Sequence, residues 1–181
     1  NQNDILDRLF LTGRYVKGEV HKTHSPSMDI QIASNFERLL FEVLDHNPKE
    51  LNRLMDLLET SGGFTIDSSL KNDLRKDFSS GSLSNIETIQ TINNYYRSKK
   101  ILLCPHSAIG VKVAEDTLRP EENTISLATA HPGKFKDTVE RAISEPIQLP
   151  RNLSEVIEKK EIYQVIPPDI NLIAGEIRKY F

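Results

Sequence analysis

The sequence has no tryptophan, only two methionines and a single cysteine, Cys104, among its 181 residues. One cysteine cannot form an internal disulfide, and it leaves no tight cluster of cysteine and histidine for a structural zinc ion. Apolar runs are also short, since Lys, Asp or Pro interrupts each of them before the roughly 18 residues that a membrane-spanning helix needs. We therefore expect a protein without a metal or a membrane span, in a reducing compartment, most simply the cytoplasm.

A surplus of positive charge is missing as well. The 23 Lys and Arg residues are outnumbered by 26 Asp and Glu residues, for a formal net charge of -3. This balance argues against nucleic acids and anionic lipids as partners. What the sequence does have, 38% hydrophobic and 27% charged residues, is typical of a globular protein with one core, or with one domain and a small satellite.

The first residues pass directly into a helical pattern. The chain begins at Asn1 rather than at methionine, and the apolar residues of NQNDILDRLF have a helical spacing that Gly13 closes. We therefore expect a chain that starts inside a fold. In this interpretation residues 1–33 form a truncated N-terminal helix, a loop and a strand at Met28–Ile32 of the large domain.

Helical patterns then succeed one another. The motif Ser34-x-x-Glu37 predicts a capped helix start, and apolar residues come after it at helical spacing. Three more helices are expected: one that begins at Pro48, one over residues 66–78, and one over residues 84–98, where Ser84-x-x-Glu87 is a second capping box. Residues 34–98 are therefore predicted to form a mostly helical insertion.

From Lys100 on, short apolar segments alternate with helical patterns. KILLCP, TISLATA and IYQVI are predicted to be strands. Helices are expected at Ser107–Thr117, at Lys134–Ile143, through Leu153–Ile157 and after Pro168. Because such alternation is typical of an α/β fold, residues 99–181 are predicted to form an α/β part with a parallel-type sheet and terminal helices.

The segment LATAHPGKFKD contains a Phe-Lys-Asp triplet that looks like a lysine placed for covalent catalysis. A catalytic lysine must lie in a desolvated or electropositive pocket, where it is neutral often enough to attack a carbonyl. The helical spacing instead leaves Lys134 and Lys136 on or near the solvent side. We therefore interpret Lys136 as a solvated surface residue.

The same segment places Thr129 and His131 where an apolar strand gives way to a helix. Open α/β folds bind ligands at the carboxyl ends of their strands, which favours a binding site here. The alternative is that Thr129 only caps the next helix. Cys104 and His106 lie in a similar turn, but their spacing does not force them to meet, so a buried neutral cysteine is favoured over a reactive one.

Three separated segments, taken in order, resemble the C-terminal half of the threonine synthase family. They are SPSMDIQIASNFERLL, CPHSAIGVKVAE and ATAHPGKFKDTVE. The opening NDILDRLFLTGRY resembles the segment after the glycine-rich phosphate loop in that family, so the resemblance runs from about residue 3 to about residue 157.

The resemblance implies a C-terminal fragment of a fold-type-II pyridoxal 5'-phosphate (PLP) enzyme, with the tryptophan-synthase-like fold. Threonine synthase converts O-phosphohomoserine and water to threonine and phosphate. In this family the Schiff-base lysine, the substrate-phosphate residues and the cofactor-phosphate loop lie in the N-terminal half. That half is the implied partner of this chain, which is expected to hold no catalytic residue and to be inactive alone.

The resemblance also implies which residues contact the cofactor. The threonine before His-Pro matches the position whose hydroxyl faces the pyridine nitrogen, which makes Thr129 the main candidate. A neutral hydroxyl, unlike a carboxylate, does not force protonation of that nitrogen. Ser107 and His106 match the family's Asp-Pro-His-Thr-Ala turn near the cofactor, and together with His131 they are weaker candidates.

Two positions depart from the family's pattern. Cys104 stands where an aspartate is usual, and Gly133 stands where an alanine is usual. In the same register HPGKF falls on the family's His-Pro-Ala-Lys-Phe, so the Phe-Lys-Asp triplet that contains Lys136 is a chance likeness of the lysine motif.

Two other interpretations remain open. The chain could come from another fold-type-II PLP enzyme, such as a dehydratase or a phospholyase-like homologue, and the substrate-phosphate residues of the absent half would decide this. It could also be a non-catalytic α/β interaction module whose apolar faces bind a partner chain. Cofactor dependence that appears only with the N-terminal half would distinguish an enzyme from such a module.

Overall fold

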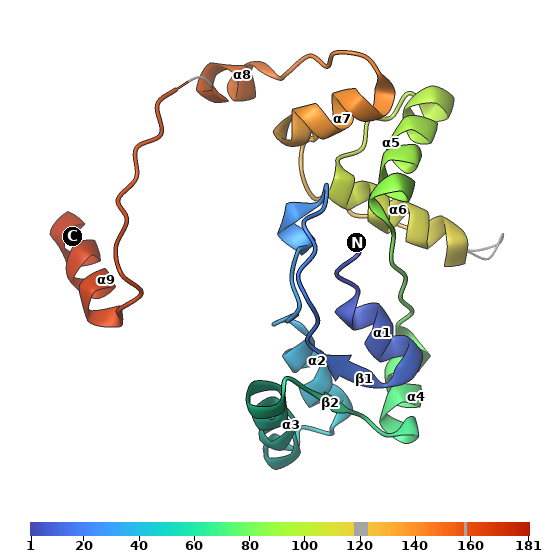
Figure 1. The fold of residues 1–181 in the computed structure, drawn as a ribbon, viewed down its shortest axis with the longest axis vertical. Coiled ribbons are helices and arrows are strands. Elements are labelled where there is room, and N and C mark those ends of the chain that lie inside the picture. Colours follow the sequence, from blue (N-terminus) through green and yellow to red (C-terminus); the bar gives the residue numbers. More distant parts are fainter. Residues whose placement is uncertain (118–122, 158) are drawn as a thin grey trace. The chain divides into compact units, whose positions relative to one another are not determined.

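The computed structural model describes residues 1–117, 123–157 and 159–181 of the chain. The chain consists of two compact units, Asn1–Gln148 and Leu149–Phe181. Figure 1 shows the elements of both units along the chain.

The first unit is mostly helical. Its longer elements are α1 (Ile5–Thr12), α2 (Phe36–Val43), α3 (Pro48–Ser61), α4 (Ser68–Asp77), α5 (Asn85–Lys99), α6 (Pro105–Thr117) and α7 (Lys136–Ile143). Two short strands, β1 (Arg14–Val16) and β2 (Gly63–Thr65), and two 3-10 turns, η1 (Pro26–Met28) and η2 (Pro132–Phe135), complete it.

The N-terminal core lies among α1 to α4 and the two strands (Figure 1). β1 and β2 pair antiparallel, with Tyr15 opposite Phe64, and the ring centroids of these two residues are 5.2 Å apart. Gly63 permits this pairing because a Cβ there would lie 2.6 Å from the Tyr15 carbonyl oxygen. The buried members of the N-terminal core are Ile5, Leu9, Phe10, Tyr15, Phe36, Leu40, Leu54, Leu58, Phe64, Ile66 and Leu74.

A second core holds α5, α6 and α7 together and so positions the candidate site. Ile92 on α5, Ala108 on α6, and Ala142 and Ile143 on α7 are its buried members. Small residues such as Ala108 allow the helices to approach closely. Because α6 is fixed in this way, its first turn is held at a defined place in the unit.

The predicted helices of the first unit are confirmed, with caps that the sequence signals. Gly13 and Gly62 end α1 and α3 in the left-handed conformation, with φ of 78° and 77°. Ser84 and Glu87 form the predicted capping box at the start of α5. Local signals were sufficient here because each cap involves residues only three or four positions apart.

Two local predictions are wrong. Ser34 and Glu37 do not cap α2, which begins after Asn35 and has no side-chain cap. The predicted strand at Met28–Ile32 is instead the end of η1 followed by a bend. Polar side chains hold this stretch: the Gln31 amide accepts from the Gly18 N–H at 3.1 Å and donates to the Glu19 carbonyl at 3.0 Å.

The predicted parallel-type sheet is also corrected. In the described part of the chain the sheet is two-stranded and antiparallel, and it consists of β1 and β2. Residues 101–104, 124–129 and 162–166 belong to no helix or strand. Apolar character predicts an extended conformation, but a strand also needs a neighbour to hydrogen-bond, and these segments find none among the described residues.

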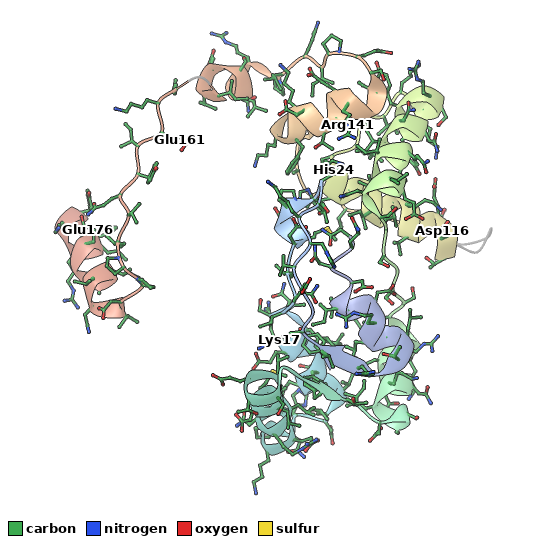
Figure 2. All side chains as sticks on the ribbon, viewed as in Figure 1. Lys17, His24, Asp116, Arg141, Glu161 and Glu176 are labelled. Atoms are coloured by element: carbon green, nitrogen blue, oxygen red, sulfur yellow. The ribbon has the colours of Figure 1, made fainter. Side chains whose placement is uncertain are left out.

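The second unit contains α8 (Arg151–Ile157), α9 (Ile170–Ile177) and the 3-10 turn η3 (Arg178–Tyr180). Both predicted helices are confirmed, and Asp169 caps α9 by accepting the N–H groups of Asn171 and Leu172. Neither helix has a buried residue. In Figure 2, Glu161 lies on an extended stretch and Glu176 on α9.

No described helix is both long enough and apolar enough to cross a membrane. The division into residues 1–33, 34–98 and 99–181 stays a prediction for the complete protein. Within this chain, β1 of the first segment pairs with β2 of the second, so these two segments share the N-terminal core.

Candidate functional site

Three polar side chains from two segments meet at the start of α6. The Cys104 sulfur lies 3.2 Å from the Ser107 hydroxyl and 3.5 Å from the Thr129 hydroxyl, and the two hydroxyls lie 3.2 Å apart. The three atoms form a nearly equilateral triangle, here called the Cys104–Ser107–Thr129 cluster. Thr129, the main predicted contact residue, is therefore held by a turn that lies 22 residues earlier in the chain.

Backbone groups fix the cluster. The N–H of Ser107 donates to the Cys104 sulfur at 3.4 Å, and the N–H of Thr129 donates to the Ser107 hydroxyl at 3.1 Å. The first bond forms because Cys104 immediately precedes α6, where the first N–H groups of a helix have no partner inside the helix. The second ties the extended segment to that helix start.

Burial and hydrogen bonding act in opposite directions on the thiol. Cys104 is 1% exposed. This burial raises the pKa of the Cys104 thiol, but hydrogen bonds from Ser107, from Thr129 and from the Ala130 N–H outweigh it, so the pKa lies below its ordinary value. Donors pointed at sulfur stabilise the thiolate, which is the physical cause of the lowering.

His106 lies beside the cluster but does not join it. Its side chain is buried, its Nε2 accepts the Ser27 N–H at 3.2 Å, and its ring centroid lies 4.7 Å from that of Phe135. Burial lowers the pKa of His106, which keeps the imidazole neutral near pH 7. Nδ1 therefore carries the proton, and this atom has no partner among the described residues. His106 thus joins three segments that are far apart in the sequence.

His131 has a local structural role. Its Nδ1 accepts the N–H of Gly133 at 3.0 Å and so caps η2. Of the predicted contact residues, the structure brings Ser107 and Thr129 together, whereas His106 and His131 make their hydrogen bonds elsewhere.

The cluster borders a pocket of about 540 Å³. Its apolar lining comes from the extended stretch before α6 and from the extended segment that leads to His131. The lining residues are Ile101, Leu102, Leu103, Cys104, Ser107, Val111, Ser126, Leu127, Ala128, Thr129, Ala130, His131 and Pro132. Thr129 also lines a second, larger hollow of about 940 Å³, together with Ser27 and His106. Thr129 thus stands between two hollows.

Asp29 was not among the residues predicted for the site, yet it organises a polar network next to it. Its carboxylate accepts the N–H and the hydroxyl of Thr23 at 2.9 and 2.6 Å, and the side-chain amides of Asn1 and Asn3 at 2.8 and 3.1 Å. Partial burial raises the pKa of Asp29, but the bonds from Thr23 and Asn1 outweigh it and lower the pKa. The signal that could have identified it is its place in SPSMDIQIAS, a resembling segment without helical spacing.

The lysine of the Phe-Lys-Asp triplet is a surface residue, as predicted. Lys136 is exposed, and its ammonium lies 3.9 Å from a carboxylate oxygen of Glu140, one turn further along α7. A covalent role for Lys136 therefore has no support in its surroundings. Within the described residues, no group of three or more acidic, histidine or cysteine side chains could hold a metal ion.

Comparison with known proteins identifies similar sequences over nearly the whole chain. Residues 107–177 match the family described as "Threonine synthase, C-terminal". Threonine synthase from Pseudomonas aeruginosa is 40% identical over 99% of the chain, and that from Saccharomyces cerevisiae is 37% identical over 99%. The chain spans only 39% and 40% of the length of these two relatives.

Solved structures agree with the sequence comparison. A PLP-bound threonine synthase from Brucella melitensis superposes on this chain with a TM-score of 0.88 at 42% identity. The superposition covers 99% of this chain and 39% of the Brucella chain. The yeast enzyme superposes with a TM-score of 0.83 at 35% identity, covering 99% and 40%. The predicted resemblance to the C-terminal half of threonine synthases is therefore confirmed.

Proposed function

We propose that this chain, which matches the C-terminal part of threonine synthases in sequence and fold, supplies one side of the active site of such an enzyme. The complete enzyme would convert O-phosphohomoserine and water to threonine and phosphate with PLP as cofactor. The observation that carries the proposal is the close superposition of nearly the whole chain on a PLP-bound threonine synthase.

The residues present suit the ring side of this cofactor. The pocket beside the Cys104–Ser107–Thr129 cluster has apolar walls, among them Leu103 and Leu127, and one polar corner. Such a lining favours a flat aromatic ring with one hydrogen-bonding atom at its edge. When bound, PLP supplies an electron sink for charge that develops next to the substrate's amino group.

Each predicted residue has a defined task in this proposal. The Thr129 hydroxyl faces the ring nitrogen, and because it is neutral it does not force that nitrogen to be protonated. Ser107 holds Thr129 in place by accepting its N–H. His106 anchors the loop of Ser27 by accepting its N–H, and His131 caps the 3-10 turn η2. The last three are therefore supporting residues.

The partner in this proposal is the N-terminal half of the same enzyme. It would contribute the lysine that carries the cofactor, the cofactor-phosphate loop and the residues for the substrate phosphate. It would also contribute strands that pair with residues 101–104 and 124–129 in a parallel sheet. Support comes from the 124–129 backbone, whose one hydrogen bond within the described residues is the Thr129 N–H to Ser107. Backbone groups in a folded core need partners.

The proposal places the complete enzyme in the cytoplasm. Its support is that the chain's single cysteine is free and buried, as is usual in a reducing compartment.

A substitution of Thr129 tests the proposal in the full-length enzyme. Thr129→Val removes the hydroxyl at nearly constant volume, and Thr129→Ser keeps it. One lost hydrogen bond between neutral partners is worth roughly 0.5–1.5 kcal/mol, or about 2- to 10-fold in rate. We expect Thr129→Val to lower phosphate release from O-phosphohomoserine by this factor, and Thr129→Ser to restore most of it.

The matched control is Thr124→Val, the same change on the same extended segment at an exposed position. It should leave phosphate release unchanged. Equal rates for Thr129→Val and Thr124→Val would contradict the proposed role of Thr129. Release of ammonia without threonine would instead identify a dehydratase.

Cofactor labelling tests the division of labour between the halves. The chain is incubated with PLP, reduced with borohydride and mapped by mass spectrometry, alone and after addition of the N-terminal half. We expect a specific lysine adduct in the N-terminal half and phosphate release only from the combination. A specific adduct at Lys136 would overturn this division.

A further inference from the structure

The Cys104–Ser107–Thr129 cluster holds more hydrogen-bond donors than it can use internally. The backbone N–H of Ser107 donates to the sulfur, and the N–H of Thr129 donates to the Ser107 hydroxyl. The three side chains add one proton each when the thiol is neutral. Which way these protons point decides what the cluster offers to a ligand.

In the neutral cluster one proton is left over. The neutral sulfur is a weak acceptor that already accepts the Ser107 N–H, and its contact with the Thr129 hydroxyl, at 3.5 Å, is the longest in the cluster. The thiol proton is therefore donated to a hydroxyl, and the sulfur does not hold the Thr129 proton. The two hydroxyls share one further bond between them. Three protons thus make two internal hydrogen bonds, and one hydroxyl proton points outward. Because Ser107 is 5% exposed and Thr129 is exposed at the pocket, that proton belongs to Thr129.

In the ionised cluster no proton is left over. A thiolate has lost its own proton and has gained one lone pair, so it is a strong acceptor that can take hydroxyl hydrogen bonds besides the Ser107 N–H. The Ser107 and Thr129 protons then both point inward, directly to the sulfur or in sequence. Thr129 presents only a lone pair to the pocket.

We propose that Cys104 is a positioning residue whose sulfur sets the hydrogen-bonding sense of the Thr129 hydroxyl, as a donor beside the thiol and as an acceptor beside the thiolate. This inference rests on the proposed function, in which Thr129 faces the ring nitrogen of PLP. A donor suits an unprotonated ring nitrogen, and an acceptor suits a protonated one. The cluster would therefore couple the proton on Cys104 to the proton on the cofactor.

The surroundings of the Cys104 sulfur favour loss of the thiol proton, which the proposed switch of Thr129 requires. The hydrogen bonds to Cys104 hold its thiol pKa below the ordinary value in spite of burial. Within the described residues, burial and hydrogen bonds account for this, and no charged side chain is among the causes. The other titratable residue that lines the 540 Å³ pocket is His131, and His106 is the titratable neighbour on α6. Neither is hydrogen-bonded to the sulfur.

The first test uses the full-length enzyme loaded with PLP that carries ¹⁵N at the ring nitrogen. Solid-state NMR then reports the protonation of that nitrogen as a function of pH. We expect a transition in the wild-type enzyme whose midpoint equals that of Cys104 ionisation, measured separately from the loss of the infrared S–H band of Cys104 as the pH rises. In Cys104→Ser the hydroxyl stays neutral, so this transition is lost. In Cys104→Asp the anion is permanent near neutral pH, so the nitrogen stays protonated.

The outcomes separate the two proposals. A full-length enzyme that binds no PLP would overturn the proposed function. An enzyme that binds PLP and keeps the wild-type ¹⁵N transition in Cys104→Ser would overturn only the role of Cys104. A purely structural role of the sulfur would change cofactor affinity without moving the midpoint, and this result would also count against the inference.

The second test leaves the buried sulfur untouched and needs no cofactor. The infrared S–H stretch of Cys104, isolated by difference from the Cys104→Ser spectrum, reports the hydrogen bonding of the thiol. We expect Thr129→Val and Ser107→Ala to shift this band and the control Thr124→Val to leave it in place. An S–H band that neither cluster variant moves would show that the thiol does not donate within the cluster, which would overturn the inference.

Discussion

The N-terminal core and the extended segment of residues 123–130 carry similar apolar side chains with opposite fates. Leu9, Leu40 and Leu74 are completely buried in the N-terminal core, whereas Ile125 and Leu127 are 87% and 77% exposed. The N-terminal core closes because four helices and the paired strands β1 and β2 of one chain surround it. The extended segment has no such cover among the described residues. Apolar residues alone therefore do not decide burial: the number of elements available to cover them does.

The largest effect should come from removing a side chain that the chain covers by itself. Leu40→Ala leaves a cavity in the N-terminal core and should lower the free energy of unfolding by roughly 2–5 kcal/mol. Leu127→Ala, the same change at an exposed position, should stay within about 0.5 kcal/mol in this chain. Urea denaturation followed by circular dichroism measures both.

The comparison becomes sharper in the full-length enzyme. If the N-terminal half covers residues 123–130, the cost of Leu127→Ala should rise there towards that of Leu40→Ala, because the side chain is then buried. An unchanged, small cost in the full-length enzyme would mean that this segment stays exposed, which would count against a sheet completed by that half.

A second prediction concerns the pairing of β1 with β2, which closes the N-terminal core. Gly63→Ala would place a Cβ 2.6 Å from the backbone of Tyr15 and Val16, so the strands must separate. We expect a loss of roughly 1–3 kcal/mol. Gly62→Asn is the control, because nothing lies within 4 Å of a Cβ there and Asn tolerates its positive φ. Similar melting temperatures for the two variants would contradict this account.

A third, smaller effect tests a local signal. Ser84→Ala removes the observed capping box of α5 and should cost about 1 kcal/mol. Ser34→Ala changes a serine that has the same sequence motif but makes no cap in the structure, so it should stay within about 0.5 kcal/mol. Thermal unfolding distinguishes them, and equal costs would mean that Ser34 caps α2 after all.

The smallest effect is electrostatic and appears only at high pH. Burial and a hydrogen bond donated to Glu115 raise the pKa of Tyr95 to about 12. Because the folded-state pKa is raised, the contribution is fully present below the pKa of an unfolded tyrosine, about 10, and is lost as the pH rises through the folded value. The pKa values of Tyr15 and Tyr96 are raised as well, so absorbance of tyrosinate should show several late-titrating groups, one of which is lost in Tyr95→Phe. Titration of every tyrosine near pH 10 would rule the bond out.

Local signals predicted much of the fold. Helices α1 to α9 were expected from apolar spacing, and Gly13, Gly62 and Ser84 were expected at their ends, since all of these depend on residues within one or two turns. The pairing of β1 with β2 was not predicted, because it joins residues 14–16 to 63–65 and leaves no local trace. The parallel-type sheet was predicted from apolar segments whose partners do not lie in the described residues.

In the candidate site, too, the sequence identified individual residues but not the contacts between them. The resemblance of ATAHPGKFKDTVE and CPHSAIGVKVAE to one family singled out Thr129 and Ser107 from the sequence. It could not show that their hydroxyls meet the Cys104 sulfur, and it described Cys104 only as a departure from the family's aspartate. Asp29 was likewise overlooked, since its partners Asn1 and Thr23 are recognised only when the chain is folded.

The sequence by itself determined the helices, their caps and the likeness to threonine synthases, because these depend on neighbouring residues and on residue identity. Only the tertiary structure decided that Cys104 is buried against two hydroxyls and that residues 123–129 are uncovered. The physical reason is that hydrogen-bond partners and burial arise from packing between distant segments, and no local pattern records which segments will meet.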